Sequence, residues 1–163
     1  MDLAQDIARI VEQERRLVFT RFDAVTAWAL GSSLKALAEV RGVAVTVEIR
    51  VARETVFFFA MPGTTPANAD WARRKRNTAD LLQRSSYGIG CELKHEHSSL
   101  EEKMGLPTRD YASHGGCFPL TLSGSGCIGT VTVSGLPQRD DHNMVVEALA
   151  PLCGVPLAEV ALA

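Results

Sequence analysis

Residues 43–51 constrain the fold more than any other stretch, because their side chains alternate strictly in polarity. The segment reads VAVTVEIRV, with valine or isoleucine at every odd position and Thr46, Glu48 and Arg50 among the even ones. Successive side chains of a strand point to opposite faces, so the pattern predicts a half-buried strand with its odd positions in the core. After the short turn ARET, the stretch VFFFAM predicts a second strand that forms a hairpin with the first.

The rest of the chain supplies helices and a second hairpin. Apolar spacing predicts helices near 3–14 and 23–40, and RLVFTRF between them favours a short strand. Residues 117–124 and 127–135 predict two strands joined by the turn GSG, and a helix follows over 136–154. Strands joined by hairpins rather than crossovers predict an α+β fold with one antiparallel sheet.

Length and composition exclude several classes of protein. The 163 residues suffice for a single domain, residues 1–163, with a sizeable core. A net charge of −2 argues against nucleic acid as a partner, because such binding needs a dense positive field. The start MDLAQDIARIVEQE lacks the features of a signal peptide, and no apolar run approaches the ~20 residues of a membrane span. We therefore expect a cytoplasmic protein without a membrane partner.

Four cysteines without a C-x-x-C motif favour reduced thiols over a metal site.

The segment DWARRKRNTADLL combines a helical pattern with four consecutive cations. At about 100° per residue, one apolar stripe of the helix is formed by Trp71, Thr78 and Leu82. Arg73 and Arg76 then point to water, whereas Lys75 lies about 40° and Arg74 about 60° from Trp71. Two cations are therefore expected to flank the face that packs on the core.

Two readings of Arg74 and Lys75 follow from this placement. They can pair with acidic residues, for example Glu101 or Glu102, and cover a sheet edge with their stems. Alternatively they form an anion site, since arginine offers a planar fork for a carboxylate and lysine a point charge.

Four segments, in order, carry a resemblance to a known family: PGTTPANADWARRKRNT, SSYGIG, DYASHGGCFPL and GTVTVSGLPQRDDHNMVVEALA. Over residues 20–155 the chain resembles the haem-degrading-domain family, also called GlcG/HbpS-like, and more closely its small uncharacterised branch from bacteria and fungi. The resemblance implies a profilin-like fold, an antiparallel sheet of about five strands flanked by helices. It also implies homo-oligomers, dimers or larger, and haem as ligand or cofactor. Because a shared fold does not fix chemistry, the site has to be argued from residues.

His114 lies in SHGGCF, where Gly115 and Gly116 permit tight backbone geometry and expose amides. An imidazole there is a candidate axial ligand of haem iron or a general base. The alternative is a loop histidine that hydrogen-bonds backbone at an oligomer interface. Ser134 and Gly135 end a predicted strand just before a helix, so they form a candidate ligand cradle, although turn geometry alone also explains them.

The other histidines give weaker signals. His142 lies on the apolar stripe of the last long helix and is predicted half-buried and neutral at pH 7, since the positive helix end disfavours imidazolium. It is either a structural histidine or a hydrogen-bonding or metal-binding group of the site. His95 and His97 form an H-x-H pair among charged residues, which predicts a solvent-exposed turn.

Two hypotheses about function follow. In the first, the chain is an oligomer that binds haem or a small anion through Arg74, Lys75 and the residues around His114, Ser134 and His142. In the second, it is a non-catalytic assembly or adaptor protein, and the same cations make ion pairs at interfaces. Enzymatic haem breakdown, suggested only by the family name, stands third because no catalytic constellation is recognisable.

Overall fold

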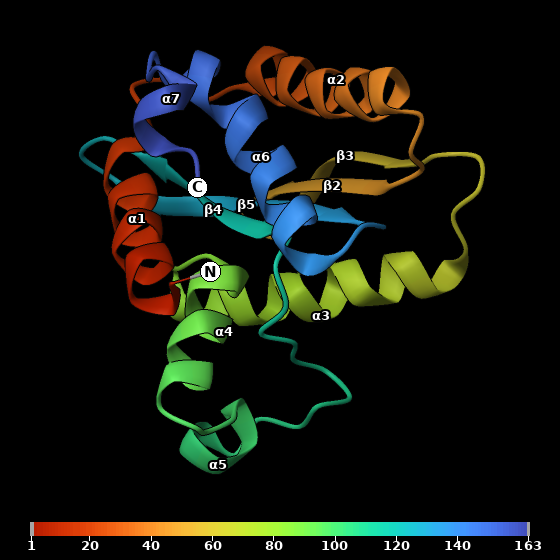
Figure 1. The fold of residues 1–163 in the computed structure, drawn as a ribbon. Helices are drawn as coiled ribbons and strands as arrows, with labels where there is room; N and C mark the ends of the chain where they lie inside the picture. The colour runs from red at the N-terminus through yellow and green to blue at the C-terminus, as the bar shows by residue number, and fades with distance from the viewer. Residues whose placement is uncertain (1, 163) are drawn as a thin grey trace.

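The computed structural model describes residues 2–162 and contains one five-stranded sheet in the order β1-β4-β5-β2-β3 (Figure 1). The strands are β1 (Val18–Phe19), β2 (Thr46–Val51), β3 (Glu54–Ala60), β4 (Cys117–Leu122) and β5 (Gly126–Ser134). The helices are α1 (Leu3–Arg16), α2 (Ala24–Arg41), α3 (Pro66–Leu82), α4 (Ser86–His95), α5 (Leu100–Met104), α6 (Gln138–Leu152) and α7 (Leu157–Val160). The predicted α+β class, with helices flanking a five-stranded sheet, is confirmed.

The sheet is antiparallel except at one edge. β2 pairs antiparallel with β3 and β5, and β5 pairs antiparallel with β4. The two-residue β1 lies parallel to β4, with Val18 opposite Thr121. The hairpins fix the direction of the four long strands, whereas β1 lies far from β4 in sequence and no tight turn sets its direction.

Helices cover both faces of the sheet. Figure 1 shows α2 and α6 on one face and α3 on the other, with α4 and α5 projecting beyond α3. The main hydrophobic core lies between the sheet and α2 and α6, where Leu30, Leu34, Ile49, Val131 and Leu149 have no exposed surface. None of the helices within residues 2–162 is long and apolar enough to span a membrane.

Coverage by α3 corrects the expectation that the 43–51 strand is half-buried. Val47 and Ile49 face the core as predicted, but Thr46 and Glu48 on the opposite face are also buried. The sheet face beneath α3 is polar because opposite residues of β2 and β5 place their side chains on the same side. Its buried members are Thr46, Glu48, Thr130, Thr132 and Ser134.

This polar face changes how α3 sits. The helix begins with a capping box between Thr65 and Asn68, followed by Pro66 as its first residue. Its buried residues are Ala72, Lys75, Thr78 and Ala79. Lys75 therefore points inward as predicted, but Trp71 is 36% exposed at the rim rather than at the centre of the buried stripe. Small residues and one lysine suit the polar layer better than an indole would.

The expectation that Arg73 and Arg76 point to water is wrong for Arg76. Its Nη1 lies 2.6 Å from Oε1 of Glu48, and the two side chains are only 12% and 10% exposed. Arg73 bonds Asp110 and Asp70, at 2.9 and 3.0 Å. The carboxylate of Glu48 on β2 is thus neutralised by Arg76 on α3, and a helical wheel cannot show this pairing.

The segment between α3 and β4 is more helical than its glycine and proline content suggested. α4 and α5 pack against the end of α3 through a small apolar cluster of Ile89, Leu93 and Leu100. His95 and His97 are exposed, as the sequence predicted. The four cysteines are unpaired thiols, again as predicted.

Candidate ligand-binding site

Lys75 forms a buried ion pair at the point where α3, β5 and α6 meet. Its Nζ lies 2.7 Å from Oδ2 of Asp141 and donates to the carbonyl oxygen of Val133 at 3.2 Å. The two charged side chains are 5% and 1% exposed. Burial raises the pKa of Asp141, and the ammonium of Lys75 opposes that effect. The expected partners Glu101 and Glu102 are exposed on α5, so Lys75 is neutralised by α6 instead.

Asp141 also organises the turn between β5 and α6. Its Oδ1 accepts from the amide of Leu136 at 2.9 Å, and its Oδ2 accepts from the amide of Gly135 at 3.4 Å. The exposed amides expected after Ser134 are therefore already occupied by a carboxylate of the chain itself. Ser134 is buried at this junction, where β5 ends.

Arg74 is held beside the site rather than inside it. Its guanidinium stacks on the ring of Trp71, 4.3 Å from the ring centroid, and its Nε and Nη2 donate to the carbonyl oxygen of Thr108. The stacked arginine thus fixes both the indole and the loop that leads to His114.

His114 lies at the surface against the other side of this arrangement. Its ring contacts Trp71 nearly edge-on, with centroids 5.0 Å apart. Desolvation lowers the pKa of His114, and the nearby charges of Lys75 and Arg74 lower it further. The imidazole is therefore neutral at pH 7, and its nitrogens have no hydrogen-bond partner within the described residues.

Two cavities meet at His114. The first, here called the His114 pocket, has a volume of about 260 Å³ and is lined by Asn68, Trp71, Lys75, His114, Ser134, Gly135, Leu136, Gln138 and Asp141. The second, of about 230 Å³, is lined by Leu3, Tyr87, Gly90, Cys91, Lys94, Ser113, His114 and Gln138. His114 and Gln138 belong to both, so the imidazole stands on the wall between them.

The two glycines after His114 allow the loop to pass close to neighbouring backbone. A Cβ on Gly115 would lie 2.0 Å from the carbonyl oxygen of Gln138. Gly116 has a φ of 128°, and a Cβ there would lie 2.3 Å from the carbonyl oxygen of Val133 and 2.9 Å from Nζ of Lys75. Both positions therefore require glycine for this close approach, and the amide of Gly115 donates to Oε1 of Gln138 at 3.3 Å.

His142 does not belong to this site. It is fully buried rather than half-buried, and it lines neither cavity. Its Nε2 lies 2.8 Å from Oε1 of Gln13, whose Nε2 donates to the carbonyl oxygen of Val160 at 2.7 Å. Burial lowers the pKa of His142 to about 3, so the predicted neutral state holds. Its Nδ1 has no partner within residues 2–162.

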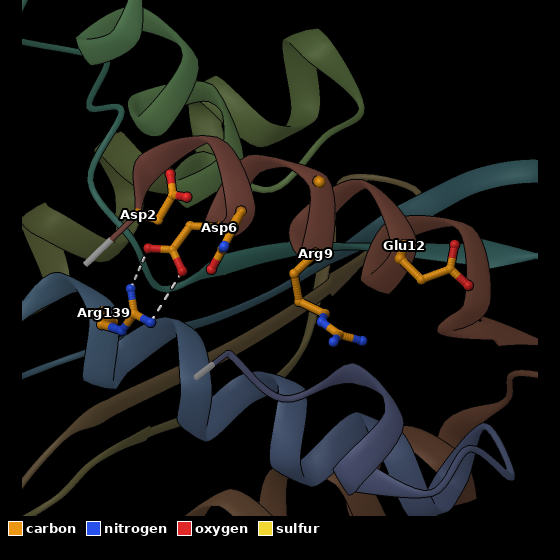
Figure 2. A pocket seen from close by; sticks show the side chains of 7 residues that line it. Asp2, Asp6, Arg9, Glu12 and Arg139 are labelled. Atoms are coloured by element: carbon orange, nitrogen blue, oxygen red, sulfur yellow. Dashed lines mark hydrogen bonds and ion pairs between the residues drawn. The ribbon is translucent and has the colours of Figure 1, made fainter.

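A larger hollow lies elsewhere, along α1. It has a volume of about 800 Å³ and is lined by Asp2, Gln5, Asp6, Ala8, Arg9, Glu12 and Arg139. Figure 2 shows Arg139 turned toward both carboxylate oxygens of Asp6, while Arg9 reaches along the groove. Arg9 donates to the carbonyl oxygen of Glu159. The two arginines of this groove, Arg9 and Arg139, are thus engaged by other groups of the chain.

The structure brings Lys75, His114, Ser134 and Gly135 to one pocket and leaves Arg74 at its edge. Sequence reasoning did not assign Asn68, Gln138, Asp141 or Lys94 to a ligand site. Asp141 lies in the first turn of a helix, where a carboxylate is explained by the helix dipole alone, so its pairing with Lys75 had no local signal. Within residues 2–162, no group of three histidine, cysteine or acidic side chains is arranged to hold a metal ion.

The sequence model of the haem degrading protein HbpS-like family matches residues 22–150. The chain belongs to the haem-degrading HbpS-like family. The UPF0303 protein of Azotobacter vinelandii is 57% identical over 162 residues, covering 99% of this chain and 98% of that protein. The chain therefore also shares its whole length with the UPF0303 branch of this HbpS-like family.

Solved structures carry the same fold. The Ybr137w protein matches with a TM-score of 0.84 and 25% identity, over 91% of this chain and 87% of that one. The PduOC:heme complex matches with a TM-score of 0.66 and 21% identity, over 82% of this chain and 94% of that one. At that identity, the second likeness shows the HbpS-like fold alone.

Proposed function

We propose that this HbpS-like protein binds haem, or another small carboxylate ligand, at the His114 pocket. The observation that carries the proposal is the state of His114: a neutral imidazole with unpartnered nitrogens, at the wall between two cavities. A neutral imidazole is a suitable axial ligand for haem iron. Haem binding by the PduOC relative supports the choice of ligand.

The charged residues around His114 have distinct parts in this proposal. Lys75 already faces Asp141, so it offers a ligand only its remaining donor capacity. Lys94, in the second cavity, has no ion pair within the described residues and is the better partner for a carboxylate such as a haem propionate. Trp71 adds an aromatic wall whose orientation is fixed by Arg74.

Size bears on which ligand is enclosed. Cavities that enclose drug-sized ligands measure about 300–1,000 Å³, and each of the two cavities here is smaller. A small organic acid fits within one of them. Haem would span the wall at His114 and leave part of its ring uncovered by a single copy, so oligomerisation would help to enclose it. When bound, haem would supply a redox-active iron next to His114.

Hemin titration followed by absorption spectroscopy tests the proposal. We expect saturation at one haem per chain and a shifted Soret band. His114→Ala should abolish the shift, whereas His95→Ala, which removes another exposed histidine outside the pocket, should leave it unchanged. A His114→Ala variant with the wild-type spectrum would refute axial ligation.

Iron-free protoporphyrin IX distinguishes binding through the propionate carboxylates from binding through the iron. We expect it to bind to His114→Ala but more weakly to Lys94→Ala, because its propionates remain while the iron is absent. If neither hemin, protoporphyrin nor a small dicarboxylate such as succinate binds in calorimetry, the pocket is not a carboxylate site.

The cellular setting completes the proposal. The four free thiols suit a reducing compartment, and we place the protein in the cytoplasm as a homo-oligomer.

An assembly or adaptor role is the second candidate function. It is favoured by exposed apolar side chains on β3, such as Phe58, and on α2, such as Trp28.

A further inference from the structure

Strand β3 lies at an edge of the sheet with half of its backbone groups unpaired. The amide of Met61 donates to the carbonyl oxygen of Val45 in the segment before β2. Backbone groups alternate in direction along an antiparallel strand, so the N–H and C=O groups of Phe58 and Ala60 point away from β2. No other described element bonds them.

Apolar side chains surround this open edge. Phe58 is 50% exposed and Val56 is 41% exposed. On the neighbouring helix α2, Trp28 is 69% exposed and packs against Phe57 with ring centroids 5.7 Å apart. Burying such side chains contributes about 25 cal/mol per Å² of apolar surface, so covering this edge is favourable.

The edge also lacks the features that usually prevent strand pairing. Exposed edges are commonly protected by charged side chains, prolines or bulges. Residues 55–65, TVFFFAMPGTT, contain no charge. The bulge lies near Val56, and Pro62 follows the strand, so both stand at the ends of the open stretch 56–60.

We propose that β3 pairs with β3 of a second copy of this chain, antiparallel and about a two-fold axis at Phe58. A two-fold axis there places Phe58 opposite Phe58 of the second copy, and Val56 opposite Ala60. No like charges meet, and the outward backbone groups of Phe58 and Ala60 acquire partners. The sheet then continues across both copies. A second copy is favoured over a foreign strand because the stretch is uncharged and self-complementary. This inference does not depend on the ligand at His114.

Sedimentation velocity of the full chain tests the proposal with Phe58→Glu and a matched control. Val11→Glu alters a residue of similar exposure, 48%, on α1 away from this edge. Wild type and Val11→Glu should have the same mass, of two copies or a multiple. Phe58→Glu should lower the mass at least twofold, because two carboxylates would face each other across the axis. A monomeric wild type, or a Phe58→Glu variant with the wild-type mass, would overturn the proposal.

Amide hydrogen exchange measured by NMR tests the pairing even if Phe58→Glu destabilises the fold. In the wild type, the amides of Phe58 and Ala60 should be protected, and in Phe58→Glu they should exchange about tenfold faster or more. The amide of Phe59 faces β2 and should remain protected in both proteins, which shows that β3 is still folded. Free exchange at Phe58 in the wild type excludes the pairing.

Discussion

Nζ of Lys75 and Oδ2 of Asp141 lie 2.7 Å apart, and both side chains are almost fully buried. This ion pair joins α3 to the start of α6. Each charge is buried because the other compensates it. Asp141 in turn holds the amides of the β5–α6 turn, so the pair links the sheet, two helices and the floor of the His114 pocket.

Removing one partner of this pair should therefore be costly. Lys75→Met leaves the carboxylate of Asp141 buried without its cation, and we expect a loss of about 3–5 kcal/mol in the free energy of unfolding. Urea denaturation followed by circular dichroism measures it. Arg74→Met is the control, with an expected loss of about 1 kcal/mol or less, because Arg74 is partly exposed.

The double variant Lys75→Met/Asp141→Asn completes the thermodynamic cycle. We expect it to be more stable than Lys75→Met alone, since the uncompensated charge is gone while the amide oxygen can still accept from the turn. A loss in the double variant equal to the sum of the losses in Lys75→Met and Asp141→Asn would show that the pair is not coupled.

His142 should make the protein sensitive to acid. Its pKa is about 3 in the folded state against an ordinary value of 6.5, so the unfolded chain binds more protons between these values. Stability then rises with pH across this window and falls as pH decreases from about 6.5, by up to about 1.4 kcal/mol per pH unit from this group.

Thermal and urea unfolding between pH 4 and 7 measure this dependence. His142→Gln should flatten the profile relative to wild type, although it also costs stability at pH 7 because the contact with Gln13 is altered. His97→Ala, which removes an exposed histidine, should leave the slope unchanged. Equal slopes for wild type and His142→Gln would contradict the assignment.

The indole of Trp71 should report the protonation of His114. A charged imidazole quenches a neighbouring indole, and the two rings are 5.0 Å apart. In a Trp28→Phe background, Trp71 is the only tryptophan, and its fluorescence should titrate with a midpoint below 6.5 because burial, Lys75 and Arg74 disfavour imidazolium.

His114→Ala in that background should remove the fluorescence step. Lys75→Met should raise the midpoint, since one of the nearby cations is gone. A midpoint above 6.5 would mean that the imidazole is not held neutral, which would contradict the proposed ligation. A step that persists without His114 would show that the fluorescence does not report this imidazole.

The sequence by itself determined the order and type of the main elements. The alternation of residues 43–51 and the turn GSG set the hairpins, because side-chain direction in a strand has a period of two. The same local logic correctly predicted that Lys75 points inward. His142 is neutral as predicted, but full burial lowers its pKa rather than the helix end that the sequence suggested. The resemblance carried by the four ordered segments was not needed for the hairpins or for Lys75, since each depends on neighbours along the chain.

Tertiary structure alone decided which charges meet and which face is polar. Lys75 and Asp141 are 66 positions apart, and Arg76 reaches Glu48 across 28 positions. Such pairs depend on how a helix is laid over a sheet, which no periodicity encodes. The placement of His114 between two cavities, and of His142 outside them, likewise follows from packing. Local pattern fixes the direction of a side chain relative to its own element, whereas its partners are set by the elements that fold against it.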